Sequence, residues 1–198
     1  MECQMKENQG LPMDRIFRRL AWEVFRLPLL RDLKLGAELI SWLRGGKSGP
    51  APHLVKQANL LRLGRRLGID TLVETGTFRA DMVVALKDHF ERIYSIELSP
   101  ELHEYSRVRC SGLGNVTLLL GDSAERLRDL CPGLSGPVLF WLDGHYSGGD
   151  TALGDGVTPI LQELDALLSN PAIDPVVVID DARLFDGTDG YPTLEDLR

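Results

Sequence analysis

Short apolar runs alternate with helical patterns over most of the chain, and this alternation restricts the folds that it can adopt. The runs are rich in Val, Ile and Leu, and polar or amphipathic stretches separate them. The predicted strands are 71–74, 92–98, 116–120, 138–142 and 176–179, and the predicted helices between them are 81–90, 100–109, 124–130 and 159–168. Strands that are apolar throughout are typical of a parallel sheet with helices on both faces. The sequence therefore predicts an α/β fold with an open, mainly parallel, Rossmann-like sheet.

Two of the predicted helices carry clear start signals. Ser99 and Thr158 each offer a hydroxyl at the N-cap, and a proline follows each of them. Proline is favoured at the first helical position, where its missing N–H is not needed. We expect helices to begin at Pro100 and Pro159.

A helical segment precedes the alternating region. Residues 14–44 predict one or two amphipathic helices, and residues 53–67 predict one more. The apolar stripe expected on that last helix is Leu54, Ala58, Leu61 and Leu67. Because residues 45–52 are rich in Gly and Pro, they resemble a linker. We expect a basic helical extension and linker over residues 1–50 and one domain over residues 51–198.

Charge is distributed unevenly along the chain. Residues 14–66 contain twelve Lys and Arg against four Asp and Glu, whereas residues 67–198 contain nine against twenty-three. An acidic main domain argues against nucleic-acid binding, which depends on clustered Lys and Arg, so we expect a small-molecule partner. The basic helices are interpreted as a solvated face or a homo-oligomer contact, and membrane-surface docking is the alternative.

The cysteines and the N-terminus bear on the cellular compartment. Cys3, Cys110 and Cys131 have neither metal-ligand spacing nor an even number for a disulfide framework. The first dozen residues are polar and lack the apolar core of a signal peptide. We expect a cytoplasmic protein.

Acidic residues follow every predicted strand. They are Glu74, Glu97, Asp122, Asp143 and the pair Asp180–Asp181. The carboxyl ends of parallel strands meet at one edge of the sheet, where ligands of open α/β folds bind. The alternative is that these acids cap the following helices, and Asp122 with Glu125 makes a plausible capping box.

The turn after the first strand favours a nucleoside without phosphates. Gly76 follows the strand and permits close backbone approach. Phe78 and Arg79 stand where a dinucleotide fingerprint needs bare backbone, so a pyrophosphate is disfavoured. Glu97 ends the second strand, where a carboxylate accepts hydrogen bonds from both ribose hydroxyls.

These ordered motifs resemble the methyl-donor site of class I S-adenosylmethionine-dependent methyltransferases over roughly residues 65–185. The resemblance implies that Glu74 and Gly76 lie near the methionine part of the donor, that Thr77 also belongs to the donor site, and that Glu97 holds the ribose. It also implies that Asp122 and Ser123 contact the adenine. One difference is Ala80, which stands where the family usually has a third glycine.

The later motifs resemble the metal-dependent O-methyltransferases of the catechol and macrolide-sugar types. By that resemblance Asp143, Asp180 and Asp181 hold Mg²⁺ through hard oxygen ligands, and His145 accepts the proton of the substrate hydroxyl. Carboxylates at the sheet edge without a metal, and a hydrogen-bonded loop histidine, are the alternatives. Residues 146–156 form either a substrate lid or a simple connection.

We therefore expect S-adenosylmethionine-dependent methyl transfer to a small-molecule hydroxyl, assisted by a divalent metal. The alternatives are a non-catalytic donor-binding or interaction module and a metal-dependent relative of the hydroxylase type. The family's complete fold has two further strands after the fifth, for which residues 1–198 show no pattern. A sheet shorter than seven strands is expected.

Overall fold

The computed structural model describes residues 28–47, 49–144, 158–188 and 191–197. The chain forms two compact units, Met1–Val55 and Lys56–Arg198. In the first unit helix α2 (Pro28–Arg44) begins at a proline and carries a Lys34–Glu38 ion pair of 3.6 Å one helical turn apart. The rest of the predicted N-terminal helices lies outside the described residues. None of the helices described here is both long and apolar enough to cross a membrane.

The second unit contains a five-stranded parallel sheet. Its strands are β1 (Thr71–Thr75), β2 (Arg92–Glu97), β3 (Val116–Leu120), β4 (Gly136–Leu142) and β5 (Ile173–Ile179). The helices are α3 (His53–Leu67), α4 (Asp81–Leu86), α5 (Pro100–Arg109), α6 (Ser123–Leu130) and α7 (Ile160–Leu168). This architecture confirms the predicted α/β, Rossmann-like class, and the described residues contain no sixth strand in the sheet.

The strand order is β3-β2-β1-β4-β5, and every neighbouring pair is parallel. The chain adds β2 and β3 on one side of β1 and then β4 and β5 on the other. This reversal makes the carboxyl ends of β1 and β4 a topological switch point, where ligands of open α/β folds bind.

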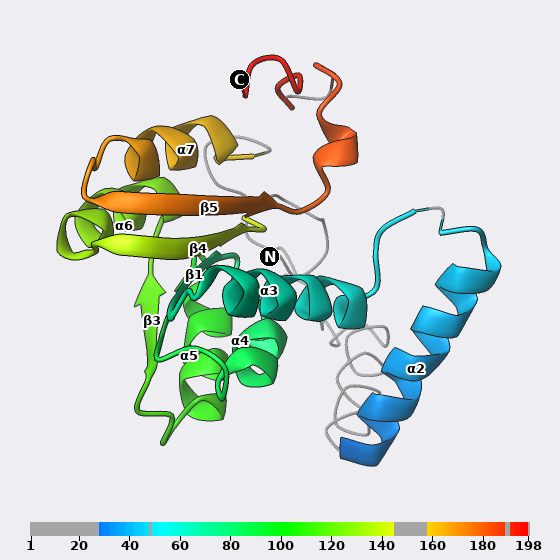
Figure 1. Cartoon of the computed structure of the whole chain (residues 1–198). Coiled ribbons are helices and arrows are strands. Elements are labelled where there is room, and N and C mark those ends of the chain that lie inside the picture. Colours follow the sequence, from blue (N-terminus) through cyan, green and yellow to red (C-terminus); the bar gives the residue numbers. More distant parts are fainter. Residues whose placement is uncertain (1–27, 48, 145–157, 189–190, 198) are drawn as a thin grey trace, which may run out of the picture. The chain divides into compact units, whose positions relative to one another are not determined.

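The two faces of the sheet have separate cores because side chains alternate along each strand. On one face Val73 and Phe140 pack with residues of α6 and α7. On the other face Leu72 and Leu139 pack with residues of α3 and α4. Figure 1 shows α6 and α7 on one face of the sheet and α3, α4 and α5 on the other. This alternation decides which strand-end acids meet, as described below.

The buried face of α3 differs from the predicted stripe. Leu60 and Gly64 are buried, whereas Ala58 and Leu67 are exposed. A Cβ on Gly64 would lie 3.0 Å from the Phe90 ring, so the missing side chain allows a close approach. Hydropathy alone does not identify Gly64 as a core position, because this residue contributes to packing by leaving space for Phe90.

The helix start signals are confirmed in one case and wrong in the other. Ser99 caps α5, with its Oγ accepting a hydrogen bond of 3.3 Å from the Leu102 N–H. At α7, Pro159 is itself the N-cap and Ile160 is the first helical residue. The Thr158 hydroxyl accepts only a 3.4 Å bond from Ile160 N–H. Helix α4 is also shorter than predicted, since Asn115 Nδ2 donates to the carbonyls of Lys87 and Phe90 and ends it early.

Candidate functional site

The turn after β1 brings the backbone unusually close to β4. Gly76 adopts a φ of +81°, and its N–H donates to the Ile96 carbonyl at 3.0 Å. A Cβ at this position would lie 2.5 Å from the Asp143 carbonyl oxygen. Two and four residues later, Phe78 and Ala80 also have positive φ values of 49° and 57°. A left-handed conformation costs an L-residue about 1–2 kcal/mol, which gives a physical reason for the family's glycine at the Ala80 position.

A buried chain of polar groups joins the ends of β1 and β2. The Ser95 hydroxyl donates to the Glu74 carboxyl, and it lies 2.6 Å from the Thr77 hydroxyl. Glu74 is 2% exposed. Desolvation raises the pKa of Glu74 to about 8, although the Ser95 hydrogen bond opposes this rise. A pKa of about 8 favours the protonated form of Glu74 at neutral pH.

Glu97 ends β2 with both carboxylate oxygens oriented by the backbone. Phe78 N–H donates to Oε2 at 2.7 Å, and Ser99 N–H donates to Oε1 at 3.0 Å. Desolvation raises the pKa of Glu97, while these backbone hydrogen bonds lower it. The carboxylate is thus fixed in position by the turn after β1 on one side and the start of α5 on the other.

Asp122 and Ser123 open helix α6. The Asp122 side chain caps the helix by accepting a 3.0 Å hydrogen bond from Glu125 N–H. The cap that the sequence allowed for Asp122 is therefore present, and its contact with the donor stays a prediction. Just before them, Gly121 N–H donates to the Glu97 carbonyl at 2.9 Å, which holds the start of α6 beside the end of β2.

Two acids after β4 and β5 meet, as the sheet register requires. Leu142 pairs with Ile179, so the next residues, Asp143 and Asp180, lie side by side. Their carboxyl groups hydrogen-bond to each other. Desolvation, and then the charge of Asp180, raise the pKa of Asp143 well above its ordinary value.

Lys56 of α3 forms an ion pair with Asp180. The two side chains are only 14% and 10% exposed. The Lys56 ammonium also lies 5.8 Å from the centre of the Trp141 ring, within the range of a cation–π contact. The sequence interpretation did not include Lys56 in the site.

The third predicted metal ligand, Asp181, has a different partner. Asp181 adopts a φ of +51° before the short 3₁₀ helix η2 (Ala182–Leu184), and its carboxylate pairs with Arg183. Among the described residues, no group of three His, Cys, Asp or Glu side chains is arranged to hold a metal. The three acids therefore do not fit the predicted Mg²⁺ site. The predicted base, His145, and the candidate lid 146–156 lie outside the described residues.

Glu163 is a second residue that the sequence interpretation missed. It projects from α7 and is 1% exposed. Its Oε1 has no hydrogen-bond donor among the described residues and lies 3.0 Å from where a Cβ on Gly144 would be. Desolvation raises the pKa of Glu163 to about 6, although the Ser123 and Thr75 hydroxyls lower it. The sequence signal that could have identified Glu163 is its helical spacing from Ile160 and Ala166, which places an acid on the buried face of α7.

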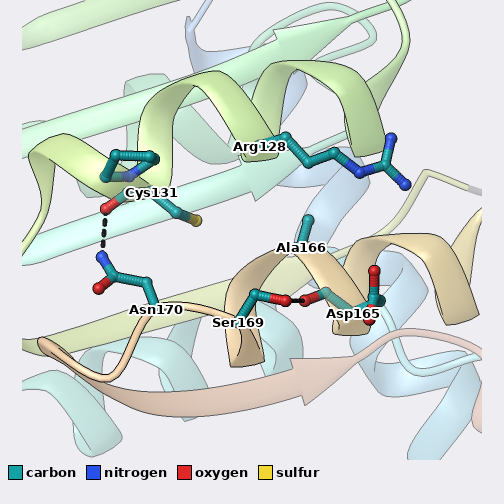
Figure 2. A pocket seen from close by; sticks show the side chains of 7 residues that line it. Arg128, Cys131, Asp165, Ala166, Ser169 and Asn170 are labelled. Atoms are coloured by element: carbon teal, nitrogen blue, oxygen red, sulfur yellow. Dashed lines mark hydrogen bonds between the residues drawn. The ribbon is translucent and has the colours of Figure 1, made fainter.

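A groove between α6 and α7 lies away from this site. Figure 2 shows it, with a volume of about 270 Å³. Asn170 Nδ2 donates to the Cys131 carbonyl across it, and the Ser169 hydroxyl donates to the Asp165 carbonyl. Because these residues precede β4 and β5, the groove is at the opposite edge of the sheet from the strand-end acids. The Asn170–Cys131 hydrogen bond joins the residues that follow α7 to those that follow α6.

The chain has the fold of the class I S-adenosylmethionine-dependent methyltransferases. An O-methyltransferase from Bacillus cereus, solved in complex with SAH, matches with a TM-score of 0.57 at 14% identity, over 91% of this chain and 82% of that one. The O-methyltransferase TomG from Streptomyces achromogenes, involved in tomaymycin synthesis and solved with SAM, matches with a TM-score of 0.55 at 19% identity, over 93% and 78%.

A curated relative is similar in sequence over part of its length. The protein-L-isoaspartate O-methyltransferase of Ignicoccus hospitalis is 33% identical over 132 residues, which are 63% of this chain. The chain spans 54% of that relative. No family model matches the sequence.

Proposed function

We propose that the carboxyl ends of β1, β2 and β3 bind S-adenosylmethionine, and that the protein transfers its methyl group to a hydroxyl of a small-molecule acceptor. The observation that carries this proposal is the Glu97 carboxylate, which two backbone N–H groups fix at the end of β2. A carboxylate has about four lone-pair positions, more than the backbone hydrogen bonds of Phe78, Ser99 and Leu98 occupy, so Glu97 can still accept a hydrogen bond from the ribose. The SAM and SAH complexes of proteins with the same fold support the choice of ligand.

The neighbouring residues supply the rest of the donor site. The close approach of Gly76 to β4 leaves the turn without a side chain at the point where the methionine part would lie. Thr77 and Glu74, both linked to Ser95, are proposed to form a polar wall beside the methionine part. Asp122 and Ser123, at the start of α6, are proposed to contact the adenine.

Methyl transfer requires no redox chemistry from the protein. Bound S-adenosylmethionine supplies an electrophilic sulfonium methyl; the acceptor oxygen forms the new C–O bond, the C–S bond breaks with its electron pair on sulfur, and the hydroxyl proton passes to a base. His145 is the predicted base and remains a prediction. Because Asp181 pairs with Arg183 and does not join Asp143 and Asp180, these three acids supply no metal site for the proposed transfer.

The acidic second unit supports a small molecule rather than a nucleic acid as the acceptor. Cys110 and Cys131 are buried free thiols, which suits the proposed cytoplasmic location. A homo-oligomer contact through the basic N-terminal helices remains a proposal, with membrane-surface contact the less favoured alternative.

Replacing Glu97 by alanine should weaken binding of S-adenosylhomocysteine by roughly 1–3 kcal/mol, about 5- to 150-fold, the scale of charge-assisted hydrogen bonds. The ribose hydroxyls then lose the acceptor that the backbone holds in place. Isothermal titration of the wild type and the variant measures this change. Glu97→Gln should lose less, because its amide oxygen still accepts one hydrogen bond.

Glu91→Ala is the matched control, since Glu91 is an exposed acid just before the opposite end of β2. It should bind S-adenosylhomocysteine as the wild type does. Equal affinities of the wild type and folded Glu97→Ala would refute the ribose assignment. Wild-type protein that binds neither S-adenosylmethionine nor its demethylated product would refute the proposed function.

A further inference from the structure

We propose that the Lys56 ammonium takes the place of a divalent cation at the ends of β4 and β5, so that the charge of Asp180 beside Asp143 is balanced by a cation of the protein itself. The evidence is the pairing of Lys56 with Asp180, the contact of Lys56 with Trp141, and the separate partner of Asp181. This inference does not depend on methyl transfer, because metal binding is measured directly.

The first step of the argument is the direction of the side chains. Along β4, Leu139 and Trp141 pack on the face that α3 and α4 cover. Asp143, two residues beyond Trp141, follows the same alternation. Asp180 follows Val178 on β5 in the same way, and Val178 packs against that core as well. Both acids therefore reach the face of the sheet to which α3 belongs. Figure 1 shows α3 on that face.

The second step is the position of Lys56 on α3. Lys56 precedes Leu60 by four residues and Gly64 by eight, so all three share one helix face. Leu60 and Gly64 are buried on that face. A lysine one turn before Leu60 is therefore directed along the sheet toward the strand ends, where its ammonium meets Asp180.

The third step is the chemistry of the surroundings. Mg²⁺ requires near-octahedral coordination by oxygen atoms. Here one side of the cation position faces the Trp141 ring, which offers a π-face and no oxygen ligand. An ammonium is satisfied by a carboxylate and an aromatic face together. With Lys56 in place the site thus suits an ammonium better than Mg²⁺, and its third acid, Asp181, pairs with Arg183.

Mn²⁺ binding followed by electron paramagnetic resonance tests the proposal. The wild type should bind Mn²⁺ only weakly, and Lys56→Met should bind Mn²⁺ at least about tenfold more tightly, the scale of one charge–charge interaction at a partly buried position. Methionine keeps the length of the side chain and removes the charge. The double variant Lys56→Met/Asp180→Asn should lose the gained binding, which locates the ion at this pair.

Lys87→Met is the matched control, because Lys87 forms an ion pair with Asp88 elsewhere on the unit. It should gain no Mn²⁺ binding. Wild-type protein that binds Mn²⁺ as tightly as Lys56→Met would overturn the proposal, and so would a folded Lys56→Met that binds none. If Lys56→Met does not fold alone, refolding in Mn²⁺ should recover it, and a failure to recover would overturn the proposal as well.

Discussion

Gly76→Ala should lower the free energy of unfolding by about 2–5 kcal/mol, from about 1–2 kcal/mol for the left-handed backbone and about 1–3 kcal/mol for overpacking. Gly76 has a φ of +81°, and a Cβ there would lie 2.5 Å from the carbonyl oxygen of Asp143 and 3.0 Å from its carbon. Both atoms are backbone, so no side-chain rotation relieves the overlap. Urea denaturation of the two proteins measures the difference.

Gly112→Ala separates the two contributions. Gly112 has a similar φ of +87°, yet a Cβ there meets no atom within 4 Å. It should cost only the backbone contribution, about 1–2 kcal/mol. Equal losses in the two variants would show that the approach of Gly76 to Asp143 does not restrict the turn. Because this turn also borders the proposed donor site, Gly76→Ala should weaken S-adenosylhomocysteine binding, whereas Gly112→Ala should not.

The sheet was predictable from the sequence because its signal is local. Buried parallel strands appear in a sequence as apolar runs. The structure confirms all five predicted strands, and β3 spans the predicted residues 116–120. The strand ends were predictable for the same reason. That Asp143 and Asp180 lie side by side follows from a register that pairs Leu142 with Ile179, and periodicity alone does not set a register.

The helical members of the site were not predicted. Lys56 lies in the predicted helix 53–67, but the stripe chosen for that helix placed Ala58 and Leu67 inside, and the structure exposes both. The correct face contains Gly64, whose contribution is the space that it leaves for Phe90. Glu163 lies among the buried residues of α7. Which helical side chain reaches a strand end depends on how the helix crosses the sheet, and hydropathy does not encode that angle.

The metal prediction failed for a related reason. Three acids at two neighbouring strand ends satisfy the composition of a Mg²⁺ site, but consecutive residues such as Asp180 and Asp181 do not project the same way from an extended chain. In the structure Asp180 meets Asp143 and Lys56, while Asp181 turns into a left-handed conformation and pairs with Arg183. The sequence contains the residue types that bind Mg²⁺, but the direction of the backbone at Asp181 keeps its carboxylate away from those of Asp143 and Asp180.

Glu74→Gln should make the protein more stable at alkaline pH and leave it nearly unchanged at pH 4.5. The pKa of Glu74 rises from 4.5 to about 8 in the folded protein, first through desolvation and then through the nearby Glu97 and Asp81 charges, against the opposing Ser95 hydrogen bond. Between these two pH values the native state keeps a proton that the unfolded chain releases. The free energy of unfolding therefore falls as pH rises through this window, by roughly 5 kcal/mol in total at about 1.4 kcal/mol per pH unit.

Glutamine has no proton to release, and its amide oxygen still accepts from the Ser95 hydroxyl. Urea denaturation at several pH values between 4.5 and 8.5 should show the two stabilities diverging as pH rises, with the variant the more stable. The difference between the curves reports Glu74 together with its effect on the raised pKa of Asp143, whereas Glu163, whose raised pKa does not depend on Glu74, affects both proteins alike. Glu101→Gln is the control: Glu101 is an exposed acid with a lowered pKa, so its curve should run parallel to that of the wild type above pH 5. Parallel curves for Glu74→Gln would mean that Glu74 is ionised in the folded protein at neutral pH, and the polar wall beside the proposed donor site would then carry a negative charge.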